Sequence, residues 1–223
     1  MLRLVLANAL YFKGDWATKF DAKRTKTAQF YNEDGEVEVE MMQLERKFYW
    51  AAVSSLDCAV LELPYKGDRI VMQILLPNQR TAGLADLESK LQSVDLQKLF
   101  DEEKFNTKVN VKLPKFKISK SLSLAEPMAE LGMKDMFTGK ADFSGIDGSK
   151  KLYVSAIVQK VFVEVNEEGS EAAAATGAVM MMRSMPLPPE QFLADHPFLF
   201  QIRDKLTGML LFQGRVVDPT ITK

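Results

Sequence analysis

The stretch Val163-Glu-Val-Asn-Glu-Glu-Gly-Ser-Glu-Ala-Ala-Ala-Ala-Thr176 decides how the rest of the chain is interpreted. It begins as a strand, because valines alternate with polar residues up to Val165. Four alanines follow, from Ala172 to Ala175, and the next strand pattern begins only near Phe198. A connection of this length without structure of its own is uncommon in a compact domain, where it is usually functional or disordered.

The residues alone leave two interpretations of this connection open. Ser170-Glu-Ala resembles a helix start, and a run of alanines favours helix. The segment could therefore be a short surface helix followed by the Pro-rich residues up to Pro189. It could equally be an exposed functional loop, and spacing does not decide between the two.

Outward from this stretch, most of the sequence is predicted as strands, because short apolar or alternating runs are separated by turn residues. The predicted strands are Leu4–Phe12, Val37–Glu40, Met42–Val53, Cys58–Leu63, Arg69–Leu76, Val109–Leu113, Val161–Val165, Phe198–Ile202 and Met209–Val217. Leucines and methionines three and four apart predict helices over Leu84–Leu91, Leu96–Leu99 and Leu124–Leu131. The fold class is therefore α+β with extensive antiparallel sheet, in one domain without repeats or a linker.

The charge balance gives no sign of a polyanionic partner. The chain has 29 Lys and Arg against 30 Asp and Glu, which predicts neither nucleic acid nor an anionic membrane as a partner. Basic residues gather between Lys19 and Lys26 and between Lys104 and Lys120. Solvated strand faces explain such runs better than a binding site does.

The N-terminal residues imitate a signal peptide, with Arg3 as a charged start and Ala7-Asn8-Ala9 as a cleavage site. The apolar stretch is too short, and Tyr11-Phe12 continue the pattern beyond the supposed cut, so we predict a buried strand and no signal peptide. No segment has the length of a membrane-spanning helix.

Catalytic residues and cofactors are not expected. His196 is the only histidine, and its place directly before Pro197 predicts a structural hydrogen bond rather than a Ser-His-Asp or Cys-His site. Cys58, the only cysteine, lies in an alternating strand pattern, so it is predicted to be buried. A single cysteine fits a reducing compartment, but also a large secreted protein. No motif for a metal, a phosphate loop or a carboxylate pair occurs.

Motifs along the whole chain resemble the serpin family of serine protease inhibitors. They are Asn8-Ala-Leu-Tyr-Phe-Lys-Gly-Asp-Trp16, Val163 to Thr176, Asp195-His-Pro-Phe-Leu-Phe-Gln-Ile-Arg203 and Leu211-Phe-Gln-Gly-Arg-Val-Val-Asp-Pro219. The resemblance implies the serpin fold, with mixed sheets A, B and C and a few helices. It also implies a single partial domain over residues 1–223 that lacks the family's N-terminal helical half.

The family mechanism assigns roles to the opening stretch. The hinge, as implied by the resemblance, comprises Glu167, Glu168, Gly169, Ser170, Glu171, Ala172, Ala173, Ala174, Ala175 and Thr176, within a hinge and reactive loop over residues 167–190. After cleavage of the loop, its small residues enter the main sheet as a new strand and trap the protease as a covalent acyl complex. Gly169 and Ser170 suit a pivot that needs backbone freedom.

The cleaved bond follows from the family's loop length. Inhibitory members keep a run of seventeen residues from the first hinge acid to the cut, which in this chain leads from Glu167 to the bond Arg183–Ser184. A long cationic side chain at Arg183 fits proteases with a carboxylate in the specificity pocket, so trypsin-like enzymes are the expected partners.

The resemblance also implies an opening and shutter region at Asn8, Trp16 and Gln159, where Gln159 replaces a frequent histidine but can still donate and accept a hydrogen bond. It implies an extracellular protein. The glycosaminoglycan site of some family members lies on a helix outside this chain, so the sequence predicts neither dependence on heparin nor independence of it. The alternatives are a non-inhibitory chaperone or carrier, and a truncated chain without inhibitory activity that self-associates through its loop and sheet.

Overall fold

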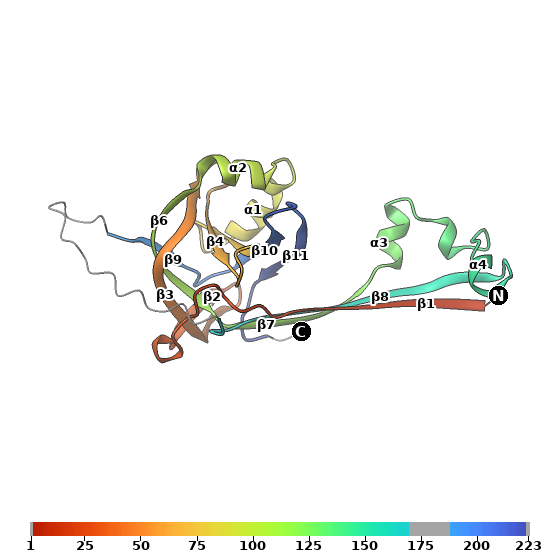
Figure 1. Ribbon diagram of the computed structural model, residues 1–223, viewed down its shortest axis with the longest axis horizontal. Helices are drawn as coiled ribbons and strands as arrows, with labels where there is room; N and C mark the ends of the chain where they lie inside the picture. Colours follow the sequence, from red (N-terminus) through yellow and green to blue (C-terminus); the bar gives the residue numbers. More distant parts are fainter. Residues whose placement is uncertain (1, 170–187, 222–223) are drawn as a thin grey trace. The chain divides into compact units, whose positions relative to one another are not determined.

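The structure is a computed structural model that describes residues 2–169 and 188–221 (Figure 1). Contacts divide the chain into two compact units. The first unit comprises Met1–Lys13, Lys117–Glu164 and Ile221–Lys223, and the second comprises Gly14–Phe116 and Val165–Thr220. The single domain predicted over residues 1–223 stays a prediction, and each unit is described by itself below.

The first unit is built on a three-stranded sheet. Its strand order is β1-β8-β7, with β1 at Leu2–Phe12, β8 at Leu152–Val165 and β7 at Phe116–Ser123. β1 and β8 are parallel and pair directly along the whole of β1 (Figure 1). Short helical segments connect β7 to β8. They are α3 (Ala125–Glu130), η3 (Asp135–Phe137) and α4 (Ser144–Asp147).

The second unit contains a larger sheet whose strand order is β11-β10-β5-β4-β3-β6-β9, with β2 paired to β3. The strands are β2 (Lys26–Asn32), β3 (Gly35–Val53), β4 (Cys58–Pro64), β5 (Ile70–Pro77), β6 (Phe105–Pro114), β9 (Glu190–Leu193), β10 (Phe198–Asp204) and β11 (Leu210–Val216). Every pairing in this sheet is antiparallel except that of β6 with β9, which is parallel.

Helices cover part of this sheet and complete its core. They are α1 (Gly83–Leu91) and α2 (Leu96–Glu103), and two short 3₁₀ turns lie at η1 (Ala22–Arg24) and η2 (Ser54–Leu56). Leu87 of α1 and Phe100 of α2 pack on Val60 and Leu75 of the sheet, in one cluster with Cys58. Cys58 is buried, as predicted, and burial, followed by the charge of Asp57, raises its pKa to about 12, so the thiol is inert.

The predicted elements are largely present, with three differences. The two strands predicted between Val37 and Val53 are one strand, β3, because its first half pairs with β2 and its last residues pair with β4. β2, β7 and β9 were not predicted, and of β8 only Val161–Val165 was predicted, although β7 carries Phe116, Ile118 and Leu122 on alternate positions. The third helix is shorter than predicted and ends at Glu130.

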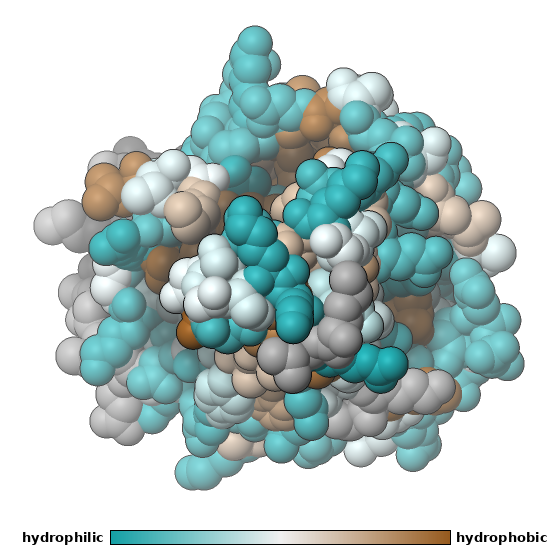
Figure 2. Space-filling view, turned by 90° about the vertical axis from the view of Figure 1, so that its right-hand side faces the viewer, coloured by the Kyte–Doolittle hydropathy of each residue, from teal (hydrophilic) through white to brown (hydrophobic). Residues whose placement is uncertain are grey.

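The predicted burial of the N-terminal strand is wrong, although the strand itself is present. Val5 and Tyr11 of β1 are 59% and 64% exposed, although the ring of Tyr11 stacks on that of Phe162 in β8, with centroids 5.1 Å apart. Leu6 and Leu10 are also exposed, and adjacent residues of a strand point to opposite faces, so both faces of β1 carry bare apolar side chains. Hydrophobic side chains at the surface are visible in brown in Figure 2.

No helix in the described ranges is long and apolar enough to cross a membrane.

Candidate functional site: the hinge and its anchors

The structure describes only the beginning of the predicted hinge. Glu167, Glu168 and Gly169 follow the end of β8 and belong to the second unit. The remaining hinge residues, Ser170 to Thr176, and the predicted bond Arg183–Ser184 lie outside the described residues.

Trp16 is the centre of the described part of the hinge. Its indole is 2% exposed and stacks on Tyr65, with ring centroids 4.4 Å apart and an interplanar angle of 10°. Trp16 Nε1 donates to the carbonyl oxygen of Asn166 at 2.8 Å, and its backbone N–H donates to that of Glu168 at 3.1 Å. Trp16 also forms a parallel bridge with Gly169. One buried aromatic residue therefore holds the chain where it leaves β8, next to the predicted loop.

Gly169 is required by close packing rather than by a special backbone angle. A Cβ atom at this position would lie 2.8 Å from both the carbonyl oxygen of Trp16 and the Cα of Lys19. Both are backbone atoms, so they cannot move aside cheaply. The φ angle of Gly169 does not lie in the left-handed region that favours glycine. In this conformation Gly169 meets a steric requirement, and its role as a pivot stays a prediction.

Glu167 is held by two groups from distant parts of the second unit. Thr25 donates its hydroxyl to one carboxylate oxygen at 2.8 Å, and the Lys115 ammonium lies 3.4 Å from the other. Lys115 also pairs with Glu40 at 3.2 Å. Burial alone would raise the pKa of Glu167, but the hydrogen bond from Thr25 and the charge of Lys115 outweigh it, and the pKa is lowered. Glu167 therefore carries a charge that is satisfied in this position of the hinge.

Sequence reasoning did not identify Thr25, Tyr65 or Lys115. Thr25 is 142 positions from its partner Glu167, and no local pattern connects them. Lys115 belongs to the basic run that was interpreted as solvated strand faces. The one available signal was its position directly after Pro114, where the strand alternation is interrupted.

The shutter residues Asn8 and Gln159 occupy paired positions on β1 and β8. Paired residues of neighbouring strands project from the same face of a sheet, so the two side chains are neighbours. Asn8 is exposed and Gln159 half-buried, and within the described ranges no hydrogen bond joins their side chains. Their role stays a prediction.

A second anchor lies beyond the undescribed segment. Asn110 of β6 joins its neighbours on both sides: Gln43 donates to Asn110 at 3.1 Å, and Asn110 donates to Gln191 of β9 at 2.9 Å. This amide ladder fixes β9, the first strand after the predicted loop, in parallel register with β6. Both ends of the segment 170–187 are thus fixed on the second unit.

His196 lies just beyond β9 and is buried. Its Nδ1 is 2.8 Å from a carboxylate oxygen of Asp195, and its Nε2 is 2.8 Å from the carbonyl oxygen of Pro77. The other carboxylate oxygen of Asp195 pairs with Arg80 at 2.5 Å. The predicted structural hydrogen bond of His196 is confirmed. No group of three or more potential metal ligands occurs among the residues that the structure describes.

Comparison with known proteins gives one consistent result. The family model for "Serpin (serine protease inhibitor)" matches residues 1–219. The chain is 45% identical to the leukocyte elastase inhibitor of Bos taurus and 42% identical to intracellular coagulation inhibitor 2 of Tachypleus tridentatus. These matches cover 98% and 97% of the chain but only 59% and 53% of the relatives, so the chain spans little more than half of their length.

Solved structures agree with the sequence comparison. Serpin48 of the insect Tenebrio molitor superposes with a TM-score of 0.80 at 41% identity, over 98% of this chain and 57% of its own. The mouse protein Z-dependent protease inhibitor superposes with a TM-score of 0.83 at 29% identity, over 98% of this chain and 56% of its own. The predicted fold, with mixed sheets and few helices, is confirmed.

The expectation of an extracellular protein is wrong. It came from the family as a whole, whereas the similar proteins are leukocyte elastase inhibitors and an inhibitor named as intracellular. Family resemblance alone does not determine the cellular compartment, because the motifs of the hinge and of the last strands determine the fold and carry no signal for secretion.

Proposed function

The chain belongs to the serpin family, and from this we propose that the complete protein inhibits serine proteases by offering Arg183–Ser184 as a cleavable bond and inserting the freed loop into its sheet. Its relatives are protease inhibitors, and a serine protease is the corresponding partner. The observation that carries the proposal is the hinge held by Trp16 directly before a run of small residues.

The sheet of the first unit supports the insertion step. β1 and β8 pair directly, with no strand between them. A loop that leaves β8 and turns back along it must run antiparallel to β8, and therefore also to β1, which is parallel to β8. Insertion between them exchanges one parallel pairing for two antiparallel ones. About a dozen inserted residues at roughly 1 kcal/mol per backbone bond would release on the order of 10–20 kcal/mol.

The alanines suit this step for a steric reason. A strand that enters a packed sheet must bring little volume, and Ala172 to Ala175 lose almost no side-chain entropy when they are ordered. A hinge of bulky or charged residues would instead favour the non-inhibitory alternative.

Arg183 defines the class of protease in this proposal. It is the only Lys or Arg between Lys160 and Arg203, so no neighbouring cation competes for a carboxylate-containing pocket. Relatives named for leukocyte elastase do not support this finer assignment. The side-chain chemistry at the predicted bond does, because elastase-type pockets are small and apolar.

We assign the protein no catalytic activity of its own. Both ring nitrogens of His196 are engaged, one by Asp195 and one by the Pro77 carbonyl, so this imidazole is not free to act as a general base.

The test uses the complete protein with trypsin and, separately, with an elastase. We expect a complex with trypsin that survives SDS and, on the same denaturing gel, a separate fragment whose N-terminal residue is Ser184. The variant Arg183→Ala should lose the trypsin complex, whereas Arg215→Ala, which removes an exposed cation elsewhere, should retain it. A primary cut at another bond would show that the loop register is wrong.

A further inference from the structure

Three lysines share the outer face of the larger sheet, on β3 and β6. Val109 and Val111 of β6 are fully buried, so Lys108 and Lys112, which alternate with them, project from the opposite face, away from the core. Lys47 of β3 pairs in register with Lys108 and therefore projects from the same face. We call Lys47, Lys108 and Lys112 the lysine face.

The amide ladder shows that β9 belongs to the same surface. Asn110 lies between Lys108 and Lys112 in β6, so its side chain projects from the lysine face. It accepts from Gln43 of β3 and donates to Gln191 of β9, at 3.1 and 2.9 Å. The lysines therefore lie next to the first strand after the predicted loop.

The lysine face keeps an excess of positive charge. Lys108 pairs with Glu45 at 2.6 Å. Neither Lys47 nor Lys112 forms an ion pair with a carboxylate of residues 2–169 or 188–221. Glu190, at the start of β9, pairs in register with Val109 and therefore projects from the other face. Two of the three cations are thus not neutralised from within this surface.

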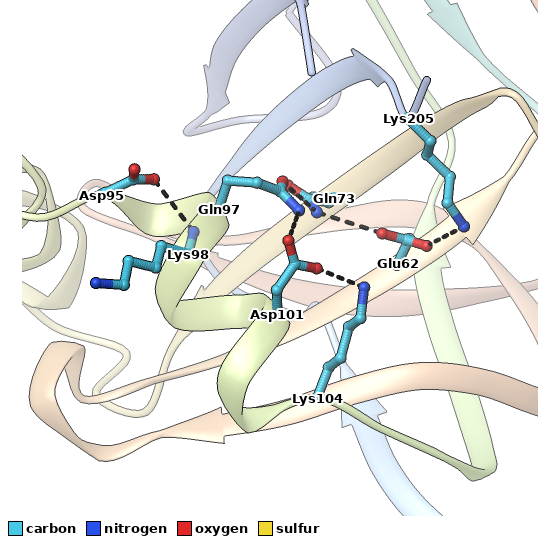
Figure 3. A network of polar contacts seen from close by, with 8 residues as sticks. All are labelled: Glu62, Gln73, Asp95, Gln97, Lys98, Asp101, Lys104 and Lys205. Carbon is cyan, nitrogen blue, oxygen red and sulfur yellow. Dashed lines mark hydrogen bonds and ion pairs between the residues drawn. The ribbon is translucent and has the colours of Figure 1, made fainter. Parts of the chain in front are cut away.

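Lysines at the border of the sheet differ in this respect. Lys104 directly precedes β6 and pairs with Asp101 at 2.5 Å, and Lys205 follows β10 and pairs with Glu62 at 3.0 Å (Figure 3). An unpaired lysine at a surface is ordinary by itself, because surface ion pairs contribute little to stability. The lysine face gains its interest from its place beside the predicted loop.

The chain enters β9 at the lysine face. β6 and β9 are parallel, so the residues before Glu190 approach from the end of β6 at which Lys108 lies. Only Ser184 to Pro189 separate the predicted cut from β9, and six residues span at most about 20 Å. A protease of roughly 200 residues is about 40 Å across. The side of its active site that binds the residues after the cut therefore comes closest to the lysine face.

We propose that the lysine face is an accessory docking surface for proteases that carry carboxylates on that side of the active site. Opposite charges at this place speed the encounter of the two proteins and leave the later insertion of the loop unchanged. The inference rests on the proposed function, because it concerns the same cleaved bond. It adds a second requirement on the partner, besides a pocket that accepts Arg183.

The test measures the second-order rate constant for association of the complete protein with anionic trypsin at about 50 mM salt. The double variant Lys47→Gln, Lys112→Gln should slow association about fivefold. The difference should nearly vanish at about 1 M salt, where the Debye length is about 3 Å. The final yield of SDS-stable complex should equal that of the parent, because these two lysines take no part in insertion.

The matched control is the double variant Lys98→Gln, Lys120→Gln, which removes the same charge from exposed positions of α2 and β7. It should slow association less than about twofold. Cationic trypsin, which has the same specificity for Arg, should not be slowed by the substitutions at Lys47 and Lys112. Equal slowing by both double variants, or by neither, would overturn the docking surface while inhibition itself stands. A parent protein that forms no complex with either trypsin would instead overturn the proposed function, and this inference with it.

Discussion

The motif from Asn8 to Trp16 begins in one kind of environment and ends in another. At its start, in β1, Asn8 is exposed, and Leu6 and Leu10 on the same face are 40% and 37% exposed. At its end, Trp16 is buried, stacked and doubly hydrogen-bonded to the hinge. Opening the pairing of β1 breaks its hydrogen bonds to β8 but exposes few further apolar side chains, whereas Trp16 fixes where the following loop begins.

The largest effect on formation of the protease complex is expected from substitutions of the small residues that follow Gly169. Ala172→Pro and Ser170→Arg should reduce the SDS-stable trypsin complex of the complete protein to background while cleavage continues. Proline removes a ladder donor, and arginine forces a bulky charge into the sheet. Ser170→Ala, which keeps the residue small, is the control and should form complex at the parental level. Undiminished complex with Ala172→Pro would refute strand insertion.

Removal of Trp16 itself should cost the most stability. Trp16→Ala deletes a buried indole, its stacking on Tyr65 and its Nε1 hydrogen bond to Asn166, so we expect a loss of about 3–5 kcal/mol. The urea midpoint of the complete protein measures this. Trp50→Ala is the comparison, because Trp50 is only half-buried and its indole N–H has no partner. An equal loss in both variants would mean that Trp16 is an ordinary core residue.

A single methyl group tests the close approach at the hinge. Gly169→Ala places a Cβ against the backbone of Trp16 and Lys19, and it should cost about 1–3 kcal/mol. Gly145→Ala is the matched control, since a Cβ there meets nothing within 4 Å. That control lies in α4 and should be neutral or slightly stabilising. If Gly169→Ala were equally harmless, the hinge would be less tightly packed than described.

Glu167 should make stability depend on pH. Its folded pKa is lowered, so its contribution is complete above the ordinary carboxyl pKa of about 4.3 and is lost as the pH falls through the lower folded value. Glu167→Gln should cost about 1 kcal/mol at pH 7, and the difference from the parent should shrink below about pH 4. Glu38→Gln, which removes an equal charge from an exposed position of β3, is the control for the change in net charge. A pH-independent difference would contradict the role of the charge.

The smallest effect on stability is expected at the exposed strand β1. Tyr11→Ser should lower the free energy of unfolding by about 0.5 kcal/mol, because the exposed side chain loses little more than its stacking on Phe162. It should nevertheless reduce self-association.

Residues 1–223 expressed alone should be oligomeric in size-exclusion chromatography and form no trypsin complex, since exposed apolar strands recruit other chains. A monomeric fragment that traps trypsin would contradict both expectations.

The spacing of apolar residues predicted those helices and strands whose formation depends mainly on neighbouring residues in the sequence. Leucines three and four apart identified α1, and alternation identified most strands of the larger sheet. The partners of Glu167 could not be predicted, because Thr25 and Lys115 reach it only through the pairing of strands. The exposure of β1 could not be predicted from its apolar residues. Such a run favours a buried strand, but it does not show whether another element of the structure covers that strand.

Because β9 pairs with β6, a cut at Arg183–Ser184 frees the chain end on one side of the bond and leaves the other side close to the sheet. On the upstream side, the chain beyond Gly169 gains a free end. On the downstream side, only Ser184 to Pro189 separate the new terminus from β9, and the 40-residue product continues into β10 and β11, the last two strands at the other end of the sheet. The two products of the cut should therefore stay associated through the sheet. They should run as two bands on a denaturing gel and appear as one particle in native mass spectrometry.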